Sequence, residues 1–249
     1  MFKPMYLYAY VVQSLVMLTS SSLFISCGND NLLTEVKKID HYPSASGVEY
    51  FDKNFYIIGD DASNFLIADS TLTIIDSLSL YSFAEKRIPK TIKADLEAIT
   101  TVYDNEQMKL LLIGSGSLQP YRNTGWIFDP VTKSVDSLRL DTFYRRLALQ
   151  GIDEINIEGA CSMPGLTILS NRGNKNYPKN FLVFTKQGFW KNQSQAPITV
   201  IRIGVNADSS VFNGVSGMDY ASKSDKLILT VSTEDTRNSM DDGAIGKSY

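Results

Sequence analysis

A four-residue pattern recurs four times in the chain, and each copy opens a run of strand-forming residues. It consists of an apolar residue, a Ser or Glu, a Gly or Ala, and a second apolar residue. The copies are Ala45–Val48, Leu96–Ile99, Ile157–Ala160 and Val215–Met218. Their second positions lie 51, 61 and 58 residues apart, and a period of about 50 residues is typical of β-propeller blades. The repeat therefore predicts a propeller.

Each copy continues in the same order, with a short strand, a polar turn and a strongly apolar second strand. The expected strand pairs are 47–51 with 55–58, 98–103 with 109–113, 160–163 with 166–169, and 217–220 with 227–231. Third strands are expected at 65–68, 125–128 and 180–184, and fourth strands at 77–82, 135–140 and 198–203. Turn residues between apolar runs indicate antiparallel hairpins. A short helix with Asp141 as its N-cap is expected at 141–150.

The predicted fold is an all-β propeller of four-stranded antiparallel blades spanning residues 44–249. The fourth repeat reaches Tyr249 where its third strand is expected to begin. We therefore expect about three and a half blades here, from a complete protein of about five or six. Residues 27–43 are expected to form a tether, and 34–39 within it an outer strand that closes the ring.

The first 26 residues differ from the rest of the chain. Lys3 is their only charged residue, and the stretch ends in Leu-Phe-Ile-Ser before Cys27. Such a segment is typical of a secretory leader, and a small residue before Cys resembles a lipoprotein signal. We expect residues 1–26 to be removed and Cys27 to carry the lipid that anchors the protein to a bacterial envelope membrane. An ordinary cleaved signal and a retained anchor are the alternatives.

Charge and cysteine content exclude several classes of function. The chain has 24 basic and 27 acidic residues, so it offers no broad basic field for nucleic acid. With Cys27 lipidated, Cys161 has no disulfide partner within the chain and is expected to be a buried apolar residue. His41 is the only histidine, so neither a Ser-His triad nor the usual zinc ligand set is expected. We expect a monomer.

Strand direction places the candidate functional residues at one mouth of the central channel. In a four-stranded antiparallel blade, the start of the inner strand and the loop after the second strand lie on the same face. Both positions are polar in this chain, and convergent polar groups in a concavity favour a binding site. The candidates for ligand or cation binding are Asp60, Asp61, Asp95, Glu97, Glu158, Glu234 and Asp235. The candidates for anion binding are Arg122 and Arg172.

Each candidate also has a structural alternative. Asp60 and Asp61 would equally suit a turn or strand cap, and the two arginines would equally suit solvated loop positions. Glu97 and Glu158 are costly to bury unless they are paired, so they favour either a shared site or pairing with an arginine of a neighbouring blade. Residues 234–242 hold four carboxylates that would suit Ca²⁺, without the spacing of an EF-hand.

Four segments resemble a known group of proteins. They are Ser46–Tyr50, Ile58–Asp61, Asp95–Ile99 and Ser232–Thr236. They are similar to Bacteroidetes lipoprotein propellers of unknown function and, more distantly, to SdiA-regulated and phytase-like esterase propellers. The resemblance covers most of residues 32–249 and implies the fold and export. It also implies an aspartate-leucine-glutamate-glycine strand start and an aspartate-rich loop, with Ala98 here in place of the glycine.

The sequence supports three functional hypotheses. The first is a lipid-anchored propeller that binds a small or polymeric ligand, anionic or sugar-like, at its polar mouth without chemistry of its own. The second is a Ca²⁺-dependent hydrolase of phosphate or carboxylic esters, with the cation on Asp60, Asp61, Glu97 and Glu158. The third is a platform for another envelope protein. Ca²⁺ is the one cofactor that these carboxylates suggest, and whether the protein is an enzyme stays open.

Overall fold

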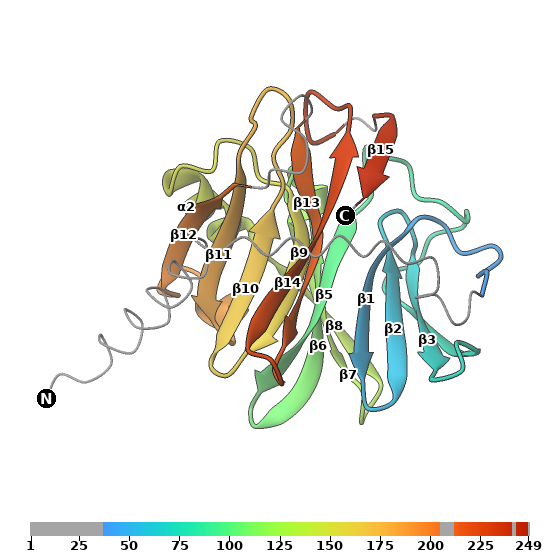
Figure 1. Cartoon of the computed structure of the whole chain (residues 1–249). Helices are drawn as coiled ribbons and strands as arrows, with labels where there is room; N and C mark the ends of the chain where they lie inside the picture. The colour runs from blue at the N-terminus through green and yellow to red at the C-terminus, as the bar shows by residue number, and fades with distance from the viewer. Residues whose placement is uncertain (1–36, 205–211, 241–242, 249) are drawn as a thin grey trace, which may run out of the picture. The chain divides into compact units, whose positions relative to one another are not determined.

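The computed structural model describes residues 37–204, 212–240 and 243–248, which form four small antiparallel sheets (Figure 1). The first sheet contains β1 (Ala45–Phe51), β2 (Asn54–Gly59), β3 (Asn64–Asp69) and β4 (Ile74–Ser79). The second contains β5 (Leu96–Asp104), β6 (Gln107–Gly114), β7 (Thr124–Asp129) and β8 (Ser134–Arg139). The third contains β9 (Ile157–Met163), β10 (Leu166–Asn171), β11 (Asn180–Lys186) and β12 (Ile198–Ile203). The fourth contains β13 (Asn213–Ala221), β14 (Lys226–Glu234) and β15 (Ile245–Ser248).

The four sheets are the blades of a propeller, as the repeat predicts. Within each blade, strands that follow one another in the chain pair side by side. The first strand of every blade is the inner one, and β5 contacts β1 on one side and β9 on the other. Strand β9 also contacts β13, so the inner strands follow one another around a common channel. The all-β propeller predicted from the sequence is therefore confirmed.

Turn chemistry explains why the first two strands of a blade form tight hairpins. Asp52 and Lys53 between β1 and β2 have φ of 47° and 64°, and Asn105 and Glu106 between β5 and β6 have φ of 50° and 64°. Two successive positive φ values define the type I′ turn, whose twist matches that of the flanking strands. The polar turn residues after β1 and β5 thus fix the register of the first two strands in blades 1 and 2.

A β-bulge interrupts every inner strand at the repeated pattern. Residues 45 and 47 pair with consecutive positions of β2, and the same shift occurs at 96 and 98 of β5 and at 215 and 217 of β13. In β9 it falls between 157 and 159. The extra residue is the second position of the pattern in all four blades. A bulge bends the strand and redirects the extra side chain, which here faces the channel.

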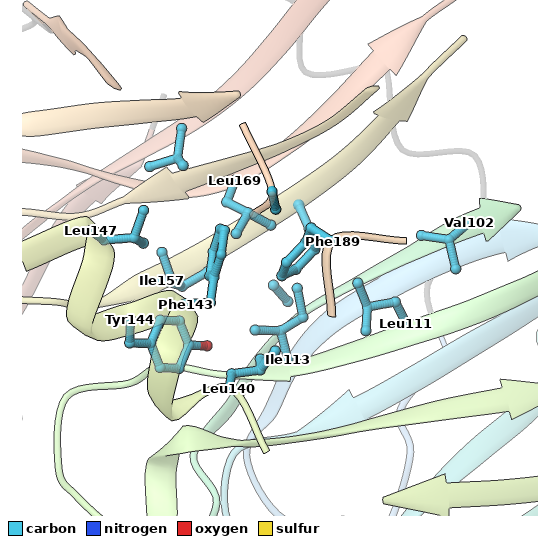
Figure 2. Close-up of a cluster of buried hydrophobic side chains, with 14 of the residues drawn as sticks. Val102, Leu111, Ile113, Leu140, Phe143, Tyr144, Leu147, Ile157, Leu169 and Phe189 are labelled. Atoms are coloured by element: carbon cyan, nitrogen blue, oxygen red, sulfur yellow. The ribbon is translucent and has the colours of Figure 1, made fainter. Parts of the chain in front are cut away.

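The core lies between the blades. One cluster of buried side chains joins blades 1 and 2, and in it Phe65 meets Phe128 edge to face with ring centroids 4.9 Å apart. A second cluster joins blades 2 and 3 and includes Leu111, Leu169 and Phe189 (Figure 2). Helix α2 (Asp141–Leu149) contributes Phe143, Tyr144 and Leu147 to it. Burying whole aromatic and aliphatic side chains stabilises each blade interface by about 1.5–3 kcal/mol per residue.

Several boundaries differ from the sequence prediction. Strand β4 begins at Ile74 rather than 77. Asp141 is the first residue of α2 and not its N-cap, because Leu140 takes that position and the Asp141 carboxylate pairs with Arg139 at 2.8 Å instead. Residues 37–39 of the expected closing strand lie outside any strand, and 34–36 lie outside the described residues.

The fourth blade extends one strand further than predicted. Strand β15 pairs with β14 between residues 234 and 245, so the blade has its third strand before Tyr249. The expectation that the third strand only begins at the end of the chain was therefore wrong. Short 3₁₀ turns, η2 (Tyr121–Asn123) and η3 (Phe189–Asn192), complete the described elements. None of the described helices has both the length and the apolar character that crossing a membrane requires.

Candidate functional site

Three equivalent backbone hydrogen bonds assemble the polar mouth of the channel. The N–H of Asp60 donates to the Ser44 carbonyl at 3.1 Å, and that of Ser115 donates to the Asp95 carbonyl at 2.8 Å. In blade 3, the N–H of Arg172 donates to the Asn156 carbonyl at 2.8 Å. In each of these three blades, the loop after the second strand is thus tied to the start of the inner strand. The sequence prediction that these two segments share one face is confirmed.

The first polar network at the mouth is centred on Asp95. Its Oδ1 lies 2.7 Å from the Lys93 Nζ, which also pairs with Asp60. Its Oδ2 accepts a hydrogen bond at 2.7 Å from Nη1 of Arg122, a side chain that is only 2% exposed. Ser115 also donates to Oδ2 of Asp95. Arg122 is therefore neither a solvated loop charge nor free to bind an anion, since its charge is neutralised inside the protein.

The second network joins blades 3 and 4 through Arg172. Its Nη2 lies 2.9 Å from Oε2 of Glu234, and its Nη1 lies 3.7 Å from Oε2 of Glu158. Glu158 also accepts a hydrogen bond from Nδ2 of Asn156 at 2.8 Å. Burial nevertheless raises the pKa of Glu158 to about 7, against the lowering effect of Arg172. The second anion-binding candidate is thus also held between carboxylates.

Glu97 is the exception among the carboxylates at the mouth. Within the described residues, its partly buried side chain has neither a hydrogen bond nor an ion pair. Burial raises its pKa well above the ordinary value, and the neighbouring charge of Glu158 raises it further. One carboxylate oxygen each from Asp60, Asp95 and Glu97 lie within 4.8 Å of one another. Lys93 sits among them as the counter-charge of Asp60 and Asp95, so Glu97 alone is left unpaired.

Residues 236–240, in the loop after β14, contribute to the wall of the mouth. The N–H and Oγ of Ser239 both donate to Oε1 of Glu154, at 2.7 and 2.6 Å. The other carboxylate oxygen of Glu154 accepts from Nδ2 of Asn174 at 2.6 Å. A pocket of about 270 Å³ lies beneath this loop, and its lining includes Glu97, Glu158 and both arginines. The mouth is therefore a polar vestibule.

Beyond the vestibule, a cavity of about 1260 Å³ runs along the inner strands of all four blades. The four bulge residues line it, namely Ser46, Glu97, Glu158 and Ser216. Its other charged lining residues are Glu49 and Asp219, and no lysine, arginine or histidine of the described chain contributes to its wall. Glu97 and Glu158 line both the vestibule and this cavity. The two carboxylates therefore stand where the vestibule opens into an acidic channel.

Small residues at the third pattern position allow neighbouring inner strands to approach one another closely. A Cβ added to Gly159 would lie 2.7 Å from Oγ of Ser170 and 3.0 Å from the backbone nitrogen of Met218. Such distances leave no room for a side chain. The pattern thus combines a bulge that aims one residue into the channel with a small residue that lets the next blade pack.

The remaining predicted site residues lie elsewhere. Asp61 pairs with Nε of Arg87 at 2.6 Å and lines a separate pocket of about 340 Å³, which also contacts Asp60. Asp235 pairs with Lys175 on the surface. Residues 241–242 of the acidic loop, the leader 1–26 and Cys27 lie outside the described residues. The predicted cation site of four carboxylates is thus divided, with Asp61 turned toward Arg87.

Sequence reasoning missed several residues of the site. Lys93 and Glu154 precede the inner strands, and nothing in a single sequence shows that their side chains turn into the mouth. Glu49 and Asp219 each follow the second pattern position by three residues in blades 1 and 4, which is a signal that could have been found. Cys161 occupies the same position in blade 3 and is buried, as expected, with burial raising the pKa of its thiol to about 12.

A family model described as a family of unknown function, DUF6929, matches residues 41–249. The match covers the whole propeller from the residues before β1 to the end of β15. This chain belongs to the DUF6929 family. No curated protein matches this DUF6929 chain. A family of unknown function is what the sequence led us to expect. The family description names no activity or ligand.

Proposed function

We propose that this DUF6929 propeller is a binding module whose channel takes a positively charged ligand between Glu97 and Glu158. The observation that carries the proposal is the position of these two carboxylates. They project from equivalent bulges of adjacent blades, line both the vestibule and the channel, and include one side chain without a partner among the described residues. Ionised carboxylates in a concavity cost free energy unless a cation compensates them.

The charge distribution favours a cation over an anion. Both arginines at the mouth are engaged, Arg122 by Asp95 and Arg172 by Glu234. An anion would have to break one of these ion pairs, which costs about 3–5 kcal/mol for a buried pair. Among the described residues, the wall of the channel carries carboxylates and no basic side chain. A cationic group entering it would replace the missing counter-charge.

The protein would act at the envelope of a bacterial cell. Residues 1–26 and Cys27 support this part of the proposal, because an apolar leader followed by a cysteine is what lipid attachment requires. Expression of the full chain in a bacterium with labelled palmitate tests it. Label in the membrane fraction that disappears in Cys27→Ser is expected, and equal labelling of that variant would refute the anchor.

The channel proposal is tested with two small aliphatic ions of similar size and opposite charge. Thermal melts and calorimetry of the full chain at pH 8 should detect n-butylammonium but not butyrate. Glu97→Gln and Glu158→Gln should each weaken n-butylammonium binding about tenfold, since each removes one charged contact. Ser216→Ala changes the same bulge position in blade 4 without a charge and should bind normally. Stronger binding of butyrate, or no binding of either ion, would refute the proposal.

Metal-assisted ester hydrolysis is a second candidate. It is favoured by the three carboxylate oxygens of Asp60, Asp95 and Glu97 within 4.8 Å of one another, because carboxylate oxygens are the ligands that Ca²⁺ prefers. Its weakness is Lys93, whose ammonium group already pairs with two of the three. A rise in melting temperature with millimolar Ca²⁺ that EDTA reverses would support this candidate, and an unchanged melt would exclude it.

A further inference from the structure

The channel holds carboxylates at two levels. The upper level is formed by Glu97 and Glu158 at the bulge position. The lower level is formed by Glu49 in β1 and Asp219 in β13. Each follows the bulge residue of its own strand, Ser46 or Ser216, by three residues. Because a strand advances about 3.3 Å per residue and the bulged residue adds less than a full step, the two levels lie about 7–10 Å apart along the channel.

The two carboxylates of the lower level, like Glu97 of the upper one, lack a cationic partner among the described residues. Oε1 of Glu49 accepts the N–H of Thr101 at 3.2 Å, and Oδ1 of Asp219 accepts the N–H of Tyr220 at 2.7 Å. Neither carboxylate has an ion pair within the described residues. Burial raises the pKa of Glu49 to about 7, and the charge of Asp219 raises it further. Backbone N–H groups therefore orient both carboxylates while leaving their charge uncompensated.

The walls between and beyond the two levels are largely apolar and aromatic. Their side chains include Tyr50, Phe55, Tyr103, Met163, Met218 and Ile228. Tyr50 and Tyr103 line this cavity and are 56% and 57% exposed. Aromatic faces attract cations, and apolar walls accept methylene groups.

A bare metal ion does not match this combination of features. Ca²⁺ requires six to eight oxygen ligands at about 2.3–2.6 Å, and apolar walls around a cavity of about 1260 Å³ do not supply them. A sugar would leave Glu97, Glu49 and Asp219 without a cationic partner. A linear molecule with a cationic group at each end and methylenes between them matches both the spacing and the walls.

Building on the proposed cation site, we infer that the channel binds a linear aliphatic diamine or polyamine. One ammonium group lies between Glu97 and Glu158, and the second lies between Glu49 and Asp219. The methylene chain lies along the aromatic and aliphatic wall. The site therefore selects for the distance between two charges as well as for their sign.

A series of amines with increasing chain length tests this inference. Calorimetry of the full chain at pH 8 compares n-butylamine, 1,3-diaminopropane, 1,5-diaminopentane and 1,8-diaminooctane. We expect affinity to rise along the series and to exceed that of n-butylamine at least tenfold for the longest diamine. Equal affinity for the monoamine and every diamine would overturn the two-level site while leaving the cation site intact. No binding of any amine would overturn both.

Two conservative variants separate the lower level from the upper one. Glu49→Gln keeps an acceptor for the Thr101 N–H, and Asp219→Asn keeps one for the Tyr220 N–H, so both retain the local structure. Each should lower the affinity for 1,8-diaminooctane about tenfold and leave that for n-butylamine unchanged. Asp136→Asn on the exposed outer strand β8 is the charge-matched control and should change neither. Unchanged diamine affinity in both channel variants would refute the inference.

Discussion

Glu97 and Glu158 project from the same bulge position of neighbouring inner strands, β5 and β9, and the charge of Glu158 adds to burial in raising the pKa of Glu97. In an unbulged strand, successive side chains alternate between the two faces of a blade and pack against its neighbours. The bulge frees one residue from this alternation and directs it to the axis. The repeated pattern therefore has two roles. Its small residue allows neighbouring blades to pack, and its bulge places one side chain of each blade in the channel.

The raised pKa of Glu158 predicts that the protein loses stability as pH rises. Glu158 holds its proton up to about pH 7 in the folded protein, against an ordinary value of 4.5. The folded state thus binds more protons than the unfolded state between these values, and the free energy of unfolding falls across this window. Urea unfolding should show that the free energy of unfolding falls between pH 5 and pH 8. This fall should be about 1–3 kcal/mol smaller in Glu158→Gln than in the wild type.

Asp136→Asn provides the control for this titration, because Asp136 is exposed on an outer strand. It should reproduce the pH dependence of the wild type. Identical pH dependence of the wild type and Glu158→Gln would show that Glu158 is already ionised at pH 5 in the folded protein.

Removing Arg122 should destabilise the protein strongly. Arg122→Met leaves Asp95 with Lys93 as its only cationic partner among the described residues and loses hydrogen bonds to Ser117 at 2.6 Å and to Asp95. Breaking a buried pair in this way costs about 3–5 kcal/mol. Arg145 is exposed on helix α2, and Arg145→Met should change stability by less than about 0.5 kcal/mol. Chemical denaturation measures both, and similar values would show that Arg122 is solvated in solution.

Gly159→Ala tests the close approach of blades 3 and 4. The added methyl group would lie 2.7 Å from Oγ of Ser170 and 3.0 Å from the nitrogen of Met218. Relieving these contacts requires backbone movement, so we expect a loss of about 1–3 kcal/mol. Gly204→Ala is the matched control, because a Cβ there has no neighbour within 4 Å among the residues that the structure describes. Equal melting temperatures of the two variants would contradict the packing role of the pattern.

Lys93 determines whether the mouth binds Ca²⁺. Its ammonium group neutralises Asp60 and Asp95, so the wild type should melt at the same temperature with millimolar Ca²⁺ and with EDTA. Lys93→Ala removes that charge and leaves three carboxylate oxygens within 4.8 Å of one another. The variant should melt at a lower temperature than the wild type in EDTA and should recover part of the loss with Ca²⁺. A Ca²⁺ effect in the wild type alone would instead favour the hydrolase.

Much of the fold could be predicted from local signals. The turns at Asp52-Lys53 and Asn105-Glu106, and the apolar second strands, mark each hairpin in the sequence itself. Strand β4 was misplaced because its residues, Ile74–Ser79, are half exposed and lack a continuous apolar run. Strand β15 was missed because only four residues form it. Short outer strands gain most of their stability from pairing with a neighbour, which local sequence does not record.

The repeated pattern by itself determined the propeller, the direction of the inner strands and the face on which Glu97 and Glu158 lie. These features follow from backbone periodicity and chain order. Only the tertiary structure decided which charges are neutralised. Lys93, Arg122 and Glu154 reach their partners across loops and blades, and such pairing depends on distances of a few ångströms between segments far apart in the chain. For this reason the arginines are internal counter-charges rather than candidate ligands, and the binding site that we propose rests on the carboxylates of the channel.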